Sequence, residues 1–143
     1  MVNPLIGAWR LITVEDHQPD GSIIYPYGEQ ALGCLIYHPD GYMSASVMAS
    51  QREPLQRQVR PWELTPDEAA GILKTMGSMY SGRWELREAE STVIHHVDAA
   101  LVPNMIGRDE VRPFELKGNR LYVYTLRPPQ KTCAIWERAA VLT

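Results

Sequence analysis

The sequence contains little of what several common functions require. Its charged residues sum to a formal net charge of -3, and its lysines and arginines are scattered along the chain. A nucleic-acid partner needs a clustered basic surface for its phosphates, so we expect none. No apolar run approaches the roughly 18 residues of a membrane-spanning helix, so we expect no membrane partner either.

The motifs of common catalytic and metal sites are missing as well. There is no GxSxG turn, Walker loop or GxGxxG fingerprint, so serine hydrolysis, nucleotide hydrolysis and dinucleotide redox lack their usual signals. The histidines, His17, His38, His95 and His96, include no His-x-His pair on one strand face. Cys34 and His38 share a face but lie roughly 13 Å apart at about 3.3 Å per residue. The sequence therefore predicts no metal and no cofactor.

The first residues and the cysteines give an expectation about the compartment. Residues 1–5 lack the basic segment and the following apolar run of a secretory signal, so we expect a cytoplasmic protein. In that compartment Cys34 and Cys133 are expected to be reduced thiols, and we assign them no chemistry.

Short runs of β-branched and aromatic residues, separated by turn residues, fill most of the sequence. This pattern predicts a single all-β antiparallel domain over residues 1–143 rather than alternating strands and helices. Turns at Asp20-Gly21, Pro39-Asp40-Gly41 and Lys117-Gly118-Asn119-Arg120 favour hairpins because these residues tolerate a positive φ. The expected strands span residues 5–16, 22–25, 32–38, 42–50, 80–88, 92–101, 109–117, 120–127 and 131–139.

One short helix is expected between the fourth and fifth strands. It begins at Thr65-Pro66-Asp67-Glu68, a capping box with proline at the first helical position, and runs to about residue 78. Its apolar face should lie against one end of the domain, with Lys74 toward water and with Ile72, Leu73 and Met76 facing in. The aperiodic residues 51–64 before it are either part of a gate or a solvated connector.

Several short motifs follow one another along the chain. They are Asn3-Pro4-Leu5-Ile6-Gly7-Ala8-Trp9, Tyr25-Pro26-Tyr27-Gly28, Tyr37-His38-Pro39-Asp40-Gly41-Tyr42-Met43-Ser44-Ala45, His95-His96-Val97, Pro103-Asn104 and Trp136-Glu137-Arg138. Together they resemble the bacterial and fungal lipocalin-like domain family. The resemblance implies a calycin-type up-and-down β-barrel of about eight or nine strands, closed at its base by Trp9 with Arg138 over it. Similar barrels serve as carriers, isomerases and cyclases, and some hold haem through one histidine, so the resemblance decides little about activity.

Strand alternation selects two polar side chains that should face the barrel interior. Arg112 has the same parity as Phe114 and Leu116, and His95 has the same parity as Val93, Val97, Ala99 and Leu101, which leaves His96 outside. An inward arginine needs an internal carboxylate or an anionic ligand, unless it reaches solvent at the mouth or backbone carbonyls. An inward histidine is either a hydrogen-bonded core residue or a proton donor or base.

Aromatic side chains are the expected pocket walls. Alternation places Tyr80 and Trp84 inside on residues 80–88, and Trp136 inside with Arg138 on the last strand. The same rule turns Tyr122 and Tyr124 outward, under a loop or in a homo-oligomer contact. The expected ligand contacts are Tyr37, Met43, Tyr80, Trp84, Phe114 and Trp136.

These residues predict a barrel that binds one small, mostly apolar or aromatic metabolite with an anionic or enolisable group. Arg112 would anchor the anion and His95 would abstract or relay a proton, which suits cofactor-free isomerisation, cyclisation or dehydration as in secondary metabolism. A non-catalytic carrier would use the same pocket. A packed barrel serving as a structural or partner-binding module would instead lack a cavity of several hundred Å³.

Overall fold

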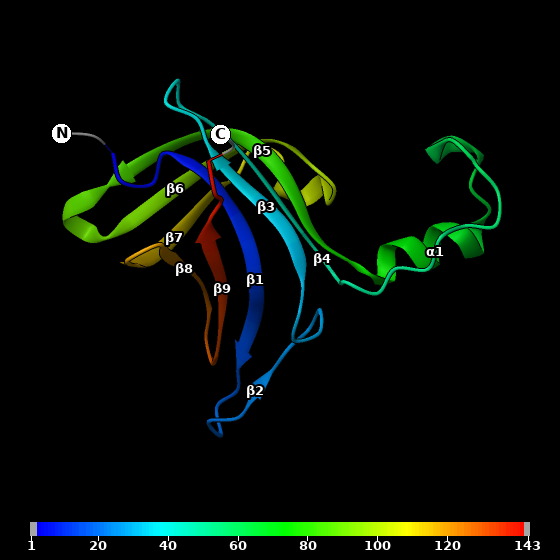
Figure 1. Ribbon diagram of the computed structural model, residues 1–143, viewed down its shortest axis with the longest axis horizontal. Helices are drawn as coiled ribbons and strands as arrows, with labels where there is room; N and C mark the ends of the chain where they lie inside the picture. Colours follow the sequence, from blue (N-terminus) through cyan, green and yellow to red (C-terminus); the bar gives the residue numbers. More distant parts are fainter. Residues whose placement is uncertain (1–2, 142–143) are drawn as a thin grey trace.

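The computed structural model describes residues 3–141 and confirms an all-β antiparallel barrel (Figure 1). Consecutive strands pair from β3 (Leu32–Tyr37) to β9 (Gln130–Arg138), and β1 (Gly7–His17) pairs with both of these, which closes the sheet. The other strands are β2 (Ile23–Ile24), β4 (Tyr42–Met48), β5 (Met76–Arg87), β6 (Thr92–Ala100), β7 (Asp109–Lys117) and β8 (Arg120–Arg127). The strand β2 is an addition beside the end of β1 and is not part of the barrel wall.

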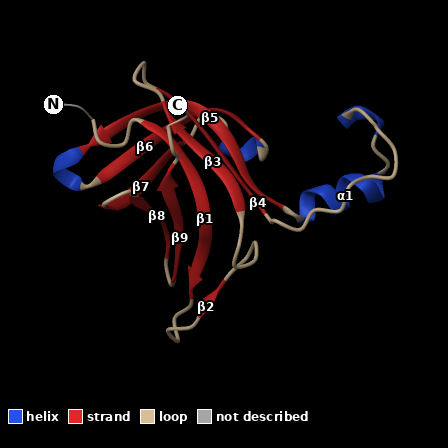
Figure 2. Cartoon of the chain, in the orientation of Figure 1, coloured by secondary structure: helices blue, strands red, loops and turns tan. Residues whose placement is uncertain are grey.

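Helical turns occur only at connections in the described part of the chain (Figure 2). The single α-helix, α1, covers Pro66–Lys74, between β4 and β5 as predicted. Three 3₁₀ turns are η1 (Pro61–Glu63), η2 (Glu88–Glu90) and η3 (Pro103–Met105). None of the helices in residues 3–141 is long and apolar enough to cross a membrane.

The hairpin between β3 and β4 turns where the sequence predicts. Gly41 has a φ of 90°, in the left-handed region that glycine adopts without steric cost. Its backbone N–H donates to the His38 carbonyl at 3.0 Å, and the His38 N–H donates to the Tyr42 carbonyl at 2.8 Å. This tight turn makes β3 and β4 antiparallel neighbours.

The interior follows the alternation of the strands, and β5 illustrates it well. Tyr80, Gly82 and Trp84 are buried, whereas Arg83, between the last two, and Glu85, after Trp84, are exposed. Successive side chains of a strand point to opposite faces of the sheet, so one parity of each strand fills the barrel. The buried parities of the strands together form one continuous apolar core.

The alternation breaks at one bulge between β5 and β6. Ser81 pairs with Ala99 but Gly82 pairs with Val97, so Asp98 is an extra residue. A Cβ on Gly82 would lie 1.9 Å from the His96 carbonyl oxygen, so only glycine permits this close approach of the two strands. The predicted inward positions of Ala99 and Leu101 are therefore wrong, because both are exposed beyond the bulge.

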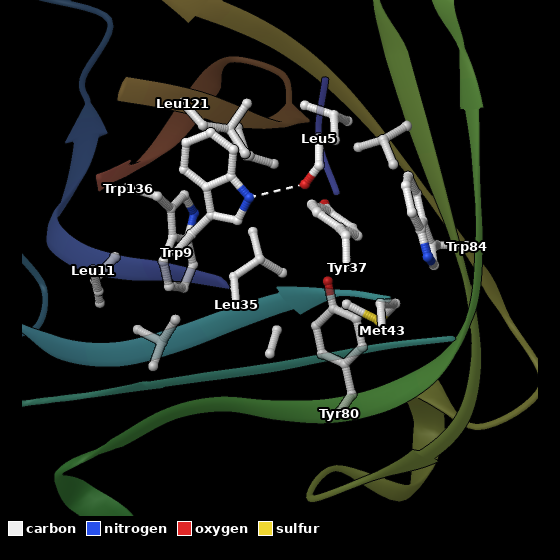
Figure 3. Close-up of a cluster of buried hydrophobic side chains, with 14 of the residues drawn as sticks. Leu5, Trp9, Leu11, Leu35, Tyr37, Met43, Tyr80, Trp84, Leu121 and Trp136 are labelled. Carbon is white, nitrogen blue, oxygen red and sulfur yellow. Dashed lines mark hydrogen bonds between the residues drawn. The ribbon is translucent and has the colours of Figure 1, made fainter. Parts of the chain in front are cut away.

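The base of the barrel is closed by Trp9, which is fully buried. Its indole Nε1–H donates to the Leu5 carbonyl at 2.9 Å (Figure 3). The Arg138 guanidinium lies 4.2 Å from the centroid of the indole ring, a cation–π arrangement. Arg138 also donates to the carbonyls of Pro4 at 2.7 Å and Ile6 at 2.9 Å, so the base is fastened to the amino-terminal segment.

The helix α1 begins as predicted but differs from the prediction in length and position. Its capping box is formed, because the Glu68 N–H donates to Thr65 Oγ1 and the Thr65 N–H donates to the Glu68 carboxylate. It ends at Lys74 rather than near residue 78, since the following residues continue β5 and pair with β4 as far as Met48. These extended strands carry α1 away from the barrel (Figure 1).

The predicted packing of α1 against a barrel end is therefore wrong. No residue of the helix is buried, and Leu73, which was expected to face inward, is 55% exposed. The segment that precedes α1 is hydrogen-bonded to the residue that follows the helix. The Arg52 guanidinium donates to Thr75 Oγ1 at 3.0 Å.

The outward tyrosines of β8 are covered by lysine side chains of the same barrel. The Lys117 ammonium lies 5.3 Å from the ring centroid of Tyr122, and that of Lys131 lies 4.3 Å from the ring centroid of Tyr124. Long cationic side chains commonly shield aromatic rings in this way. The half-buried state of these tyrosines thus needs no oligomer contact.

We predict that Trp9→Ala lowers the free energy of unfolding by about 3–5 kcal/mol, because it leaves a large cavity at the base and removes the surface on which Arg138 lies. Urea denaturation would measure the loss. Trp62→Ala is the matched control, since Trp62 is 75% exposed and its removal should change stability by no more than about 0.5 kcal/mol. Similar losses for the two variants would contradict the role of Trp9.

Candidate functional site

The interior of the barrel contains a cavity of about 620 Å³ that opens to solvent at one end. This volume lies in the range typical of small-molecule sites. Its inner wall carries apolar side chains from several strands, most of them small or medium in size, namely Val14, Leu35, Ala45, Val47, Val123 and Ala134, together with the larger Trp136. A packed interior, the third alternative considered from the sequence, would not leave such a space.

Loops at one end of the barrel form the mouth of the cavity. Tyr27 borders it from the connection between β2 and β3, and Asn104 and Arg108 border it from the connection between β6 and β7. Arg127 and Gln130 border it from the turn between β8 and β9. Sequence reasoning did not assign these residues to the site, although Tyr27 and Asn104 belong to motifs that carried the family resemblance.

His95 lies at the polar end of the cavity between two tyrosine hydroxyls. Tyr37 Oη of β3 is 2.7 Å from His95 Nε2, and Tyr80 Oη of β5 is 2.6 Å from His95 Nδ1. All three residues are buried, with exposed fractions of 0% for Tyr37, 8% for Tyr80 and 2% for His95. The strand order places β3 and β6 apart in the wall, so the contact between Tyr37 and His95 crosses the barrel interior.

Burial, together with smaller contributions from the nearby Arg112 guanidinium and from His96, lowers the pKa of His95 to about 3. A charged imidazole would lose its hydration in this interior, so the neutral form is favoured. The adjacent His96 points outward, where a hydrogen bond to Asp109 raises its pKa. The predicted inward and outward orientations of the two histidines match their environments.

Arg112 faces the cavity but is already paired. Its guanidinium lies 3.2 Å from the Glu110 carboxylate, and the two side chains are only 13% and 14% exposed. A buried arginine needs such a partner, because an unpaired buried charge is costly. Sequence reasoning missed Glu110, although it precedes Arg112 by two residues on β7 and so has the same inward parity.

The predicted wall residues separate into two groups. Tyr80 and Trp136 line the cavity together with His95 and Arg112. The other four predicted contacts, Tyr37, Met43, Trp84 and Phe114, are not among the lining residues. Tyr37 is hydrogen-bonded to His95 but does not line the cavity. Its ring centroid is 4.5 Å from that of Trp84 (Figure 3). The Trp84 indole N–H donates to the His38 carbonyl at 3.0 Å. These aromatic residues therefore pack around His95 without lining the cavity themselves.

The residues at the site are poorly suited to hold a metal or haem. Both ring nitrogens of His95 have tyrosine partners, so neither is free to coordinate iron. Within residues 3–141 no three His, Cys, Asp or Glu side chains are grouped to hold a metal ion. Cys34 and Cys133 are free thiols, and burial raises the pKa of Cys133 to about 11, which makes it a weak nucleophile.

Comparison with known proteins identifies the family. The sequence profile of the Lipocalin-like domain matches residues 6–142. The chain belongs to this family. A search of curated proteins found no match. For a lipocalin-like barrel the enclosed cavity is the natural candidate site, and its specificity depends on the side chains of this chain.

We predict that His95 makes the stability of this lipocalin-like barrel depend on pH in acid. Its pKa is lower in the folded state than the ordinary 6.5, so the unfolded chain takes up a proton that the folded chain does not. The contribution is fully present above pH 6.5 and is lost as the pH falls toward 3, by up to about 1.4 kcal/mol per unit.

Urea denaturation of the wild type and of His95→Gln between pH 7 and pH 4 would measure this effect, because glutamine does not titrate. The curve for His95→Gln should be flatter. His96→Gln is the control and should not flatten the curve, since the pKa of His96 is raised rather than lowered. Parallel curves for the wild type and His95→Gln would contradict a neutral His95.

Proposed function

We propose that this barrel binds one small, mostly apolar molecule that carries an anionic or enolisable group. The observation that supports this most strongly is the cavity of about 620 Å³ with an apolar wall and one polar end. Sites for small organic molecules combine these two features, because the apolar wall supplies affinity and a few polar groups fix orientation. Membership of a lipocalin-like family suggests small-molecule binding as well.

The polar end would orient the ligand through Arg112 and Tyr80. Both side chains line the cavity, and both can donate a hydrogen bond to a ligand oxygen. Glu110 balances the charge of Arg112, so the site attracts a fully charged anion less strongly than a lone arginine would. A ligand oxygen with partial negative charge, such as a carbonyl or an enol, suits this pair.

The cluster also favours a second candidate function, cofactor-free isomerisation, cyclisation or dehydration. In this proposal Arg112 stabilises the negative charge that develops on the oxygen of an enolate when a proton leaves the adjacent carbon. Water in the open cavity takes up the proton that leaves the carbon, and the Tyr80 hydroxyl, held by its hydrogen bond to the neutral His95, donates the proton that the ligand gains, which solvent then restores to Tyr80. A histidine with a pKa near 3 is a weak base by itself, so we assign it no direct abstraction.

We predict that filling the cavity abolishes ligand binding without unfolding the barrel. Ala45 is buried and lines the cavity, so the added atoms of Ala45→Leu would enter the empty space. Thermal-shift screening of small apolar acids, phenols and ketones should find compounds that stabilise the wild type and not this variant. Ala8→Leu, on the exposed face of β1, is the matched control and should bind as the wild type does. Equal stabilisation of all three proteins would contradict an interior site.

If this protein is an enzyme of the proposed kind, we predict that it accelerates the exchange of acidic carbon-bound protons of a ligand with solvent. A carrier would bind the ligand without this effect. Proton NMR of 2-acetylnaphthalene in D₂O would follow the loss of its methyl signal. The wild type should accelerate this loss, and Arg112→Met should slow it by about 10²-fold, because this variant removes the contact that stabilises the enolate oxygen. His95→Gln should also slow it, because Tyr80 then loses its histidine partner. Binding with no acceleration by the wild type would favour the carrier.

A further inference from the structure

The contacts of His95 require one hydroxyl proton of the cluster to point elsewhere. A neutral imidazole carries one N–H, and each tyrosine carries one O–H. Two hydrogen bonds, one between Tyr37 Oη and Nε2 and one between Tyr80 Oη and Nδ1, use two of these three protons. The third belongs to whichever tyrosine accepts a hydrogen bond from the imidazole.

The two tyrosines differ in whether a hydrogen-bond acceptor is available for this third proton. Tyr37 is fully buried, packs on Trp84 and does not line the cavity. In the described residues its hydroxyl has no second hydrogen-bond partner. Tyr80 does line the cavity, so a ligand or a water molecule can accept its proton. A buried donor without an acceptor is disfavoured, so the free proton belongs on Tyr80.

We propose that His95 is held as the Nδ1–H tautomer and that the Tyr80 hydroxyl is the donor this barrel presents to a neutral carbonyl oxygen of its ligand. Tyr37 donates to Nε2, and Nδ1–H donates to Tyr80 Oη. His95 is then a positioning residue, because it orients Tyr80 and both its ring nitrogens are already hydrogen-bonded to tyrosines. This inference rests on the proposed function and narrows it from an anionic or enolisable group to an uncharged carbonyl compound.

Two charged neighbours support this choice of ligand. The Arg112 guanidinium counteracts, through its charge and a hydrogen bond, the rise that burial produces in the pKa of Tyr80. A phenol oxygen that accepts a hydrogen bond from His95 is a stronger donor through its own proton. The Glu110 carboxylate, 3.2 Å from Arg112, offsets the charge of that guanidinium, so the polar end of the cavity beside Tyr80 attracts a carboxylate less than an unpaired arginine would.

The tautomer can be measured without any ligand. Nitrogen-15 NMR of the imidazole side chains, with His95→Gln to identify the signals, distinguishes a protonated from an unprotonated ring nitrogen. We expect a protonated Nδ1 and an unprotonated Nε2, unchanged between pH 5 and pH 8. A protonated Nε2, or a signal that averages the two tautomers, would overturn the inference.

The ligand class can be measured with three probes that share one ring system. 2-Acetylnaphthalene carries a neutral carbonyl, 2-naphthoate carries a charge, and 2-ethylnaphthalene carries no oxygen. We expect the wild type to bind the ketone about tenfold more tightly than the hydrocarbon, the value of one good hydrogen bond, and more tightly than the anion. Tyr80→Phe should lose most of the tenfold preference.

Tyr122→Phe is the matched control, since it removes a phenol oxygen on the outer face of the barrel, away from His95 and the cavity, and should retain the preference for the ketone. A preference that survives in Tyr80→Phe, or tighter binding of the anion than of the ketone by the wild type, would overturn the inference. Failure of the wild type to bind any of the three probes would contradict the proposed function instead, and the nitrogen spectra would still decide the direction of the Tyr80 hydroxyl.

Discussion

The pairing of β1 with β9 is the constraint on which the other features of the molecule depend. β1 pairs with β3 along one edge and with β9 along the other, from Trp9 opposite Arg138 to His17 opposite Lys131. Closure pairs the backbone N–H and C=O groups that would be free at the edges of an open sheet. It also directs every second side chain of each barrel strand into one shared interior. The same register places Arg138 beside Trp9, so the contact that closes the wall also brings the guanidinium to the ring that fills the base.

Side-chain size then decides which part of this interior is packed and which is open. A small antiparallel barrel has room either for its own side chains or for one small ligand. Large residues such as Trp9 and Tyr37 fill one part of it, whereas Ala45 and Ala134 border the cavity. His95 lies at the boundary between these two parts. Its tyrosine partners form hydrogen bonds with both ring nitrogens, and its low exposure keeps the imidazole uncharged.

Local patterns predict features that depend on neighbouring residues, and they miss those that depend on contacts across the barrel. Alternation is local, so it placed His95 and Arg112 inside and would also have placed Glu110 there. The hydrogen bond between Tyr37 and His95 joins strands far apart in the sequence, and no spacing indicates it. The bulge beside Gly82 depends on how β5 pairs with β6, and the outward direction of α1 depends on how far β4 and β5 pair; turn signals report neither.

The central claim is that the interior of the barrel is a ligand site whose polar contact is Tyr80. A crystal structure of the protein with 2-acetylnaphthalene tests it most directly. The account predicts the ring system against the apolar wall, with the carbonyl oxygen at a hydrogen-bond distance of about 2.7 Å from Tyr80 Oη. A ligand bound outside the barrel, or inside it with the carbonyl oxygen directed to the mouth at Arg108, would contradict the account.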